Sequence, residues 1–323
     1  MAPAFSERKR FQVARQALAI LFEIFLEGYA HSDFHAGNLY WVKGQLIATD
    51  FEAMQPYRSS RRPAFPESYD ITGKGLESPF RTNNMCYLRA KSAALGEVLE
   101  IPLDIVLQDC AARLKAELRD ACQTFQSSGR RHRCRAGRIY SSFSLPYLTV
   151  SASEAQRNSA RRFENLQVSR ANLEHKSVLD LGSNVGAMLF EANKWKPRRS
   201  LGIEYDVRKV QIARRIAAYN GLNRVEFLQA DVDLLTTEGL GNTFDVVMCL
   251  AIEAHVKNPR RLYALLAGVT SQVLYFEGNS STDPSAVRAN LLEAGFDRVE
   301  ILGTSDDDCI PNNNNRPLLI AFK

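Results

Sequence analysis

A glycine-marked turn after an apolar run is the part of this 323-residue sequence best suited to chemistry. The segment Ser177–Leu181 has the character of a central strand, and Gly182 and Gly186 follow it, where the backbone can turn and approach a ligand too closely for any Cβ. The next strand-like run contains Glu204, whose carboxylate could accept hydrogen bonds from ribose hydroxyls. Asn184 stands where a dinucleotide fingerprint has its middle glycine, so the spacing favours an adenosine cofactor over a pyrophosphate.

An ordered series of motifs around this turn resembles the class I S-adenosylmethionine (SAM)-dependent methyltransferases, whose first motif is an acid-x-Gly-x-x-x-Gly turn. Asp180 supplies the acid of that motif, and Asp231 follows the third strand-like run. The resemblance implies SAM as the cofactor. The residues that it implies at the cofactor site are Asp180, Gly182, Ser183, Asn184, Gly186, Glu204, Tyr205, Asp231, Val232 and Cys249.

Strand-like and helix-like segments alternate through the second half of the chain, which predicts an α/β fold with a parallel sheet and helices on both faces. Residues 303–316 have no helical pattern and contain four consecutive asparagines, so we expect a polar loop and an antiparallel final strand. The resemblance implies a Rossmann-like sheet of seven strands. The predicted strands are 177–181, 200–205, 224–228, 245–250, 273–276, 299–302 and 318–322, and the predicted helices include 207–220, 258–267 and 284–294.

A second cluster of polar residues lies near the start of the sequence. Phosphoryl transfer needs one carboxylate to orient or deprotonate the acceptor hydroxyl, and hard oxygen ligands to hold magnesium. Asp33 suits the first role, and Asn38 and Asp50 suit the second. Two short strand-like runs between Asn38 and Asp50 would bring these ligands together.

Residues 31–38 together with 50–52 resemble the catalytic and metal-binding loops of protein-kinase-like phosphotransferases, above all sugar, lipopolysaccharide and aminoglycoside kinases. The resemblance implies Mg²⁺ and ATP as ligands. Such kinases also need a glycine-rich loop and a strand-borne lysine, and neither precedes His31. Either the chain is a piece of a longer protein or this lobe has lost its ATP clamp. In both cases we expect little or no phosphorylation by this chain alone.

The length and composition of the chain predict two globular parts. We predict a mainly helical, partial kinase-like lobe over residues 1–128, a basic linker over 129–139, and the methyltransferase domain over 140–323. The basic run at 130–138 could bind phosphate, nucleic acid or an anionic membrane surface, or it could be a solvated linker.

Other features of the composition exclude several classes of protein. Hydrophobic residues make up 45% and charged residues 24% of the chain, which excludes a disordered or fibrous protein. The six cysteines are scattered without a C-x-x-C pair, which argues against a zinc site or a disulfide framework. No apolar run is long enough to span a bilayer and no signal peptide is evident, so we expect a cytoplasmic protein. The oligomeric state is left open.

The methyl acceptor is harder to predict. His255 follows the fourth strand and could act as a general base, or it could cap the next helix. Glu277 follows the fifth strand, and residues 138–147 with Arg157, Arg161 and Arg162 could form a lid. Three hypotheses follow: a methyltransferase for a sugar, glycan or other small molecule, resembling bifunctional kinase–methyltransferases; a methyltransferase for tRNA or another nucleic acid; or a non-catalytic scaffold with two ligand-binding lobes.

Overall fold

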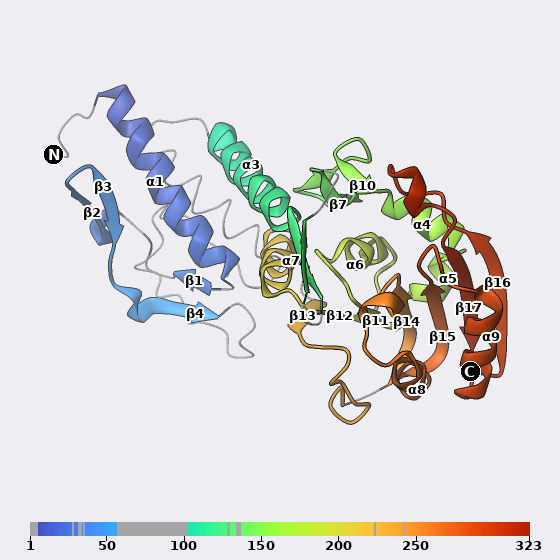
Figure 1. Cartoon of the computed structure of the whole chain (residues 1–323). Coiled ribbons are helices and arrows are strands. Elements are labelled where there is room, and N and C mark those ends of the chain that lie inside the picture. The colour runs from blue at the N-terminus through green and yellow to red at the C-terminus, as the bar shows by residue number, and fades with distance from the viewer. Residues whose placement is uncertain are drawn as a thin grey trace. The chain divides into compact units, whose positions relative to one another are not determined.

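The chain divides into two compact units in the computed structural model (Figure 1). The structure describes residues 6–27, 29–31, 34, 36–56, 103–127, 130–133, 137–222, 224–241 and 243–323. The first unit comprises Met1–Lys115 and Ala218–Gly221, and the second comprises Ala116–Ala217 and Leu222–Lys323.

A seven-stranded sheet is the centre of the second unit, with the strand order β13-β12-β11-β14-β15-β17-β16. The first five strands in this order run parallel, whereas β17 is antiparallel to both of its neighbours. This arrangement confirms the predicted seven strands and the antiparallel final strand. Their bounds are β11 Ser177–Leu181, β12 Arg199–Glu204, β13 Val225–Gln229, β14 Phe244–Leu250, β15 Thr270–Glu277, β16 Arg298–Thr304 and β17 Pro317–Phe322.

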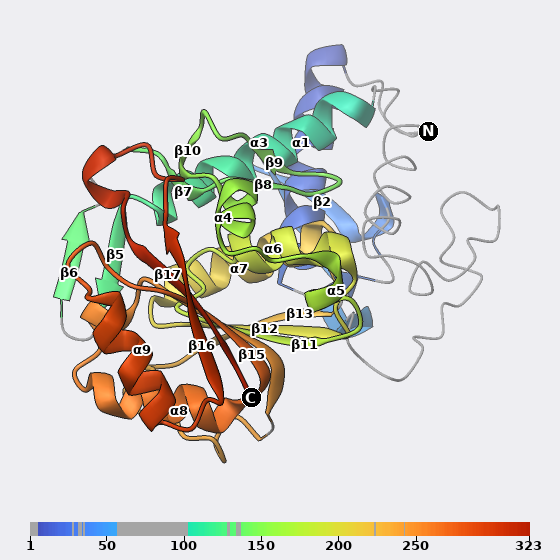
Figure 2. The same ribbon diagram turned by 90° about the vertical axis from the view of Figure 1, so that its right-hand side faces the viewer.

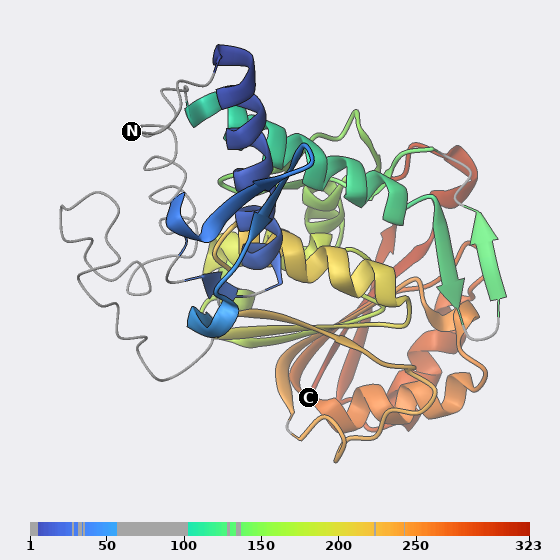
Figure 3. The ribbon, with the colours of Figure 1, turned by 90° about the vertical axis from the view of Figure 1, so that its left-hand side faces the viewer.

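Helices cover both faces of this sheet. Helices α6 (Ala187–Ala192) and α7 (Val207–Tyr219) lie on one face, and α8 (Pro259–Val269) and α9 (Pro284–Glu293) lie on the other (Figures 2 and 3). Side chains from the strands and from α8 and α9 form a continuous apolar core, and all five residues of β11 are buried. The apolar run that predicted β11 is therefore explained by a strand in the middle of the sheet that is covered on both sides.

Shorter elements precede the sheet in the sequence, and the first of them crosses the boundary between the two units. Helix α3 (Leu103–Ala121) leads into a hairpin of β5 (Thr124–Ser127) and β6 (Arg130–Arg133), which pair only with each other. The basic run therefore begins as a β-strand. The remaining elements before the sheet are β7 (Ile139–Ser141), β8 (Phe143–Ser144), β9 (Thr149–Val150), β10 (Ala155–Arg157), α4 (Ser159–Asn165) and α5 (Arg170–Leu173).

Single-turn helices complete the second unit, at η5 (Asn193–Trp195), η6 (Glu253–His255) and η7 (Pro311–Asn313). Two of them border the polar loops that follow β14 and β16. These loops lie at the carboxyl end of the parallel strands, which is the end where ligands bind in open α/β sheets.

The first unit is built around helix α1 (Glu7–Leu26), whose buried residues recur at helical spacing: Ala14, Ala17, Leu18, Leu21 and Phe22. Strand β2 (Leu39–Val42) pairs antiparallel with β3 (Gln45–Ala48), and β1 (Tyr29–His31) pairs antiparallel with β4 (Met54–Pro56). Two short helical turns, η1 (Ala36–Asn38) and η2 (Phe51–Ala53), flank the β2–β3 hairpin. No helix among the described residues is long and apolar enough to cross a membrane.

Candidate active site

A cavity of about 540 Å³ lies at the carboxyl ends of the parallel strands in the second unit. This volume is within the ordinary range of small-molecule sites. Its walls come from the turn after β11, the end of β12, the loops after β13 and β14, and the loop between β16 and β17. The predicted cofactor residues on these loops are thus brought to one place, although they are spread over more than fifty positions in the sequence.

The turn after β11 depends on backbone conformations that favour glycine. Gly182, Asn184 and Gly186 all have positive φ angles, of 74°, 52° and 84°. A Cβ at Gly186 would collide with the ring of Phe227, so this position needs glycine for packing as well as for conformation. Gly186 is also the N-cap residue of α6. The backbone N–H groups of residues 182–186 are all bonded within the protein, which fixes the shape of this turn at the cavity wall.

Glu204 lies at the end of β12, is almost fully buried and holds this turn in place. Its Oε2 accepts a hydrogen bond of 2.8 Å from the backbone N–H of Asn184, and its Oε1 accepts one of 2.9 Å from the N–H of Asp206. A carboxylate oxygen has two acceptor sites. Glu204 can therefore keep both backbone bonds and still accept hydrogen bonds from two hydroxyl groups in the cavity.

Asp180, the last acid before the turn, is the most unusual group in the cavity wall. It is 2% exposed, and its Oδ2 has no hydrogen-bond partner among the residues that the structure describes. Burial raises the pKa of Asp180 to about 7, with Arg162 opposing and Glu204 adding to the shift. A buried carboxylate with an unpaired oxygen is costly, and a cationic ligand would remove that cost.

The remaining predicted cofactor residues separate into two groups. Tyr205, Asp231 and Val232 line the cavity and are half-buried, and Asp231 Oδ1 accepts a hydrogen bond from the N–H of Asp233 at 2.9 Å. The side chain of Cys249 lies instead in the apolar core, where burial holds the pKa of its thiol far above the ordinary value. Cys249, predicted as a cofactor residue, is not among the residues that line the cavity; side chains alternate along a strand, and its neighbour Leu250 lines the cavity instead.

His255 lies in η6 after β14, is exposed and lines the same cavity. The loop that carries it is fastened to the loop after β15, because Asn279 Oδ1 accepts a hydrogen bond from the N–H of Ala254 at 3.2 Å. Ala251, at the start of the loop, has a φ angle of 62°, which is rare for a residue with a side chain. The histidine is thus held on a well-fixed loop at the edge of the cavity.

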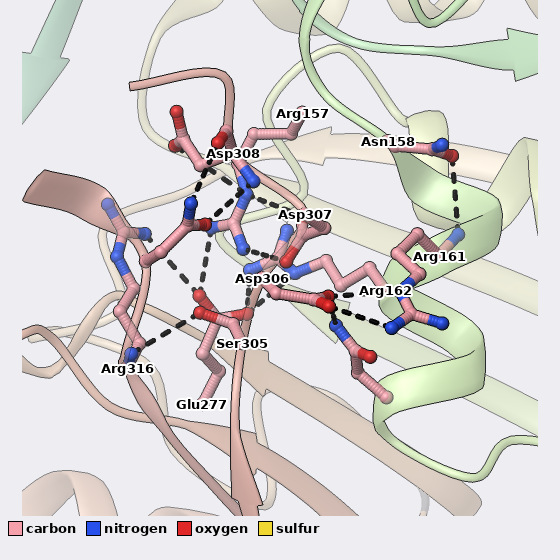
Figure 4. Close-up of polar contacts among 12 residues, drawn as sticks. Arg157, Asn158, Arg161, Arg162, Glu277, Ser305, Asp306, Asp307, Asp308 and Arg316 are labelled. Atoms are coloured by element: carbon pink, nitrogen blue, oxygen red, sulfur yellow. Dashed lines mark hydrogen bonds and ion pairs between the residues drawn. The ribbon is translucent and has the colours of Figure 1, made fainter. Parts of the chain in front are cut away.

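A buried cluster of charges borders the cavity (Figure 4). Arg157 binds Asp307 with two hydrogen bonds of 2.6 and 2.7 Å and Glu277 with a third of 2.8 Å. Arg162 Nε donates to the other oxygen of Glu277 at 2.6 Å, and Arg316 Nη1 lies 3.4 Å from Glu277. Both Arg162 and Arg316 line the cavity.

The same cluster keeps Glu277 ionised although the side chain is completely buried. Burial raises the pKa of Glu277, but Arg162 and Arg157 outweigh it and hold the pKa at about 2. The sequence marked Glu277, Arg157 and Arg162 as polar residues near the site. It gave no sign of Asp307 or of Arg316, which lie in a loop without regular structure.

The kinase-like constellation falls in the first unit and is described only in part. The β2–β3 hairpin brings Asn38 and Asp50 together, with Asn38 Nδ2 3.5 Å from Asp50 Oδ2. The backbone carbonyl of Asn38 also accepts a hydrogen bond from the N–H of Thr49 at 2.9 Å. Asp33 lies outside the described residues. Within the described part of the chain, no group of three or more His, Cys, Asp or Glu residues could hold a metal ion.

Comparison with known proteins identifies part of the second unit. A family model for the methyltransferase domain matches residues 172–286, which contain the glycine turn and most of the cavity wall. Over these residues the chain is similar to methyltransferase domains. The match does not extend to the residues before 172, so the kinase-like resemblance of the first unit has no support from it. None of the curated proteins matches this chain.

Solved structures resemble the chain at low identity. The crystal structure of EvdMO1 is 21% identical with a TM-score of 0.42, and the match covers 56% of this chain and 43% of that one. The N-terminal domain of EvdMO1 with S-adenosylhomocysteine (SAH) and D-fucose is 19% identical with a TM-score of 0.44, covering 67% of this chain and 96% of that domain. The bifunctional kinase–methyltransferase WbdD is 21% identical with a TM-score of 0.45, covering 58% of this chain and 44% of WbdD.

Proposed function

We propose that the second unit is a SAM-dependent methyltransferase. One observation carries this proposal: the buried, unpaired carboxylate oxygen of Asp180 lies in the same cavity wall as the guanidinium group of Arg162. The methionine end of SAM is a zwitterion, whose ammonium group suits Asp180 and whose carboxylate suits Arg162. The site therefore offers a negative charge to the ammonium group of the methionine and a positive charge to its carboxylate.

The other residues of the cavity fit the rest of the cofactor. Glu204 has free acceptor positions for the two ribose hydroxyls, and Asp231 with Val232 lies where the adenine would extend. SAM supplies an electrophilic methyl group for in-line displacement. This chain's residues would hold the cofactor and the acceptor in line, which supplies much of the acceleration in such a reaction.

The role of Glu204 gives a direct prediction. Glu204→Gln keeps the size of the side chain but removes its charge, so the ribose hydroxyls lose a charged acceptor, and we expect SAM affinity to fall by roughly 1–3 kcal/mol. Isothermal titration calorimetry measures this loss. Glu226→Gln, on the exposed side of β13, is the matched control and should bind SAM as the wild type does. Equal SAM affinity in Glu204→Gln and the wild type would remove Glu204 from the cofactor site.

We propose a sugar, a glycan or another small hydroxylated molecule as the acceptor. The support is the composition of the cavity mouth, where Asn279, Asn312 and Asn313 provide amide groups that can both donate and accept hydrogen bonds. Hydroxyl groups have the same dual capacity. The test is SAH release from SAM in the presence of a panel of sugars and glycans, and the scaffold hypothesis fails as soon as one acceptor yields SAH.

One observation favours nucleic acid as a second candidate acceptor. The β5–β6 hairpin starts after Cys122 and ends before Tyr140, both of which line the cavity, and Tyr140 N–H lies 3.5 Å from Cys122 Sγ. Five arginines occur between positions 130 and 138, and no acidic residue occurs between Asp120 and Glu154. Binding to nucleic acid through this hairpin should weaken steeply as salt rises, whereas a neutral glycan would scarcely respond.

For the first unit we propose a kinase-like lobe that lacks its phosphate clamp. Asn38 and Asp50 are close enough to share a magnesium ion, but nothing among the described residues supplies the glycine-rich loop or the lysine that such a lobe needs. We expect Mg²⁺-dependent ATP binding that is weak or undetectable by calorimetry, together with no transfer of phosphate from ATP. Tight ATP binding with acceptor phosphorylation by this chain alone would contradict that view.

A further inference from the structure

Glu277 is unusual because one buried carboxylate contacts arginines from three separate elements. Arg157 comes from β10, Arg162 from α4, and Arg316 from the residue before β17. The side chains of Glu277 and Arg157 are 0% exposed, and that of Arg162 is 4% exposed. Burial of an ionised carboxylate costs several kcal/mol unless its partners are well placed, so the arrangement calls for a physical reason beyond filling the core.

The need to neutralise Arg157 does not supply that reason. Asp307 already binds Arg157 through both of its carboxylate oxygens, at 2.6 and 2.7 Å. Asp308 Oδ2 lies a further 3.8 Å from Arg157 Nε. Arg157 would therefore remain paired if Glu277 carried no charge.

Arg162 depends on Glu277 much more strongly. Its Nε donates a hydrogen bond of 2.6 Å to Oε2 of Glu277, and its Nη2 lies 2.6 Å from the same oxygen but has no hydrogen-bond partner within the described part of the chain. No second carboxylate among the described residues comes within ion-pair distance of Arg162. Two contacts to one oxygen fix the plane of the guanidinium group. Nη2 is therefore left with hydrogen-bonding capacity for a ligand, and Arg162 lines the cavity, where its charge also lowers the pKa of Asp180.

We infer that Glu277 is a positioning residue for cofactor binding, which orients Arg162 so that its guanidinium group meets the carboxylate of the SAM methionine. Glu277 itself is not among the residues that line the cavity, so its effect on the cofactor is exerted through Arg162. The second oxygen of Glu277, Oε1, accepts a hydrogen bond of 2.8 Å from Arg157 and lies 3.4 Å from Nη1 of Arg316. The inference rests on the proposed function, because it assigns Arg162 to the cofactor.

The affinities for two related ligands distinguish a positioning role of Glu277 from a general structural role. SAH contains the amino acid group, whereas 5′-methylthioadenosine keeps the adenosine and the thioether and lacks the amino acid. Glu277→Gln should bind SAH about tenfold or more weakly than the wild type, because a misplaced guanidinium group no longer meets the carboxylate, and should bind methylthioadenosine within about twofold of the wild type. Calorimetry with the full chain measures both affinities.

A control and a double variant complete the experiment. Asp306 lies in the loop between β16 and β17 and accepts exposed hydrogen bonds from Arg161 and Asn165 of α4. Asp306→Asn weakens these bonds and should leave the affinities for SAH and methylthioadenosine unchanged. Arg162→Met should lose SAH affinity selectively. Adding Glu277→Gln to it should cost nothing further, since both changes remove the same interaction.

Equal weakening of SAH and methylthioadenosine in Glu277→Gln, or additive losses in the double variant, would overturn the inference. If Glu277→Gln does not fold, the same two affinities are measured for Glu277→Asp, which keeps the negative charge but moves the carboxylate away from Arg162 by the length of one methylene group. A selective loss for SAH in that variant supports the role of Glu277, and an unselective loss or none overturns it. Failure of the wild type itself to bind SAH would instead overturn the proposed function.

Discussion

Replacement of Asp180 by Asn is expected to lower SAM affinity by about 10- to 100-fold and to raise the melting temperature at neutral pH. The affinity falls because the SAM ammonium group loses a charged, buried acceptor, a contact that contributes roughly 1.5–3 kcal/mol. The stability rises because the empty wild-type protein must bury a carboxylate whose Oδ2 has no partner in the described part of the chain. Calorimetry and thermal unfolding measure the two effects separately.

The sign of the pH dependence follows from the raised pKa of Asp180. The folded state holds the proton up to about pH 7, whereas the unfolded chain releases it near the ordinary value of 3.8. The contribution of this group to the free energy of unfolding therefore falls as pH rises from about 4 to 7 and is constant above that. Asp180→Asn should be no more stable than the wild type near pH 4 and should gain its full advantage above pH 7.

Cofactor affinity should change in the opposite direction. An ammonium group binds the ionised form of Asp180, so SAM affinity of the wild type should increase as pH rises toward 7 and then level off. That pH dependence should be absent in Asp180→Asn. A variant that binds SAM like the wild type at every pH would place the ammonium group elsewhere.

His255→Ala is expected to lower methyl-transfer turnover by about 10²-fold while SAM affinity stays near normal. The reason is that His255 lies at the cavity edge and could accept the proton that an acceptor hydroxyl loses. At saturating SAM, where the Asp180-dependent change in affinity has no effect, turnover of the wild type should fall in acid as the imidazole is protonated, and this acid limb should vanish with the histidine. Turnover at several pH values, with an acceptor that yields SAH, measures both.

A residue on the same loop serves as a control for His255. Lys257→Ala lies two positions further on and leaves the backbone contact of Lys257 N–H with Asp233 intact, so it should keep normal turnover. If His255→Ala retains full turnover and the wild-type pH profile, the histidine is structural and methyl transfer relies on positioning alone.

The sheet and the cofactor turn could be predicted from the sequence because both are local signals. The run Ser177–Leu181 is apolar throughout, and glycine marks both ends of the turn that follows. Antiparallel pairing of the last strand was predicted from a connection too polar and irregular for a helix. The burial of Cys249 in the apolar core was not predicted, because its place near the end of β14 was considered without the alternation of side chains along a strand.

The buried charge cluster could not be predicted for a different reason. Arg157 meets Glu277 at a separation of 120 positions and Asp307 at 150, and nothing in the sequence pairs these residues. The individual charges were visible, but a pattern of spacing gives no sign of which distant carboxylate a given arginine will meet. Only the fold, which brings β10, α4 and the loop before β17 to one end of the sheet, defines these partners.

Titration of the folded 323-residue chain with SAM at pH 8 tests the central claim most directly. Asp180 is ionised at this pH, so we predict saturable binding of one SAM per chain, competition by SAH at the same site, and much weaker binding by Asp180→Asn. Absence of any SAM or SAH binding by a chain that is folded by circular dichroism would contradict the assignment of the cavity to this cofactor.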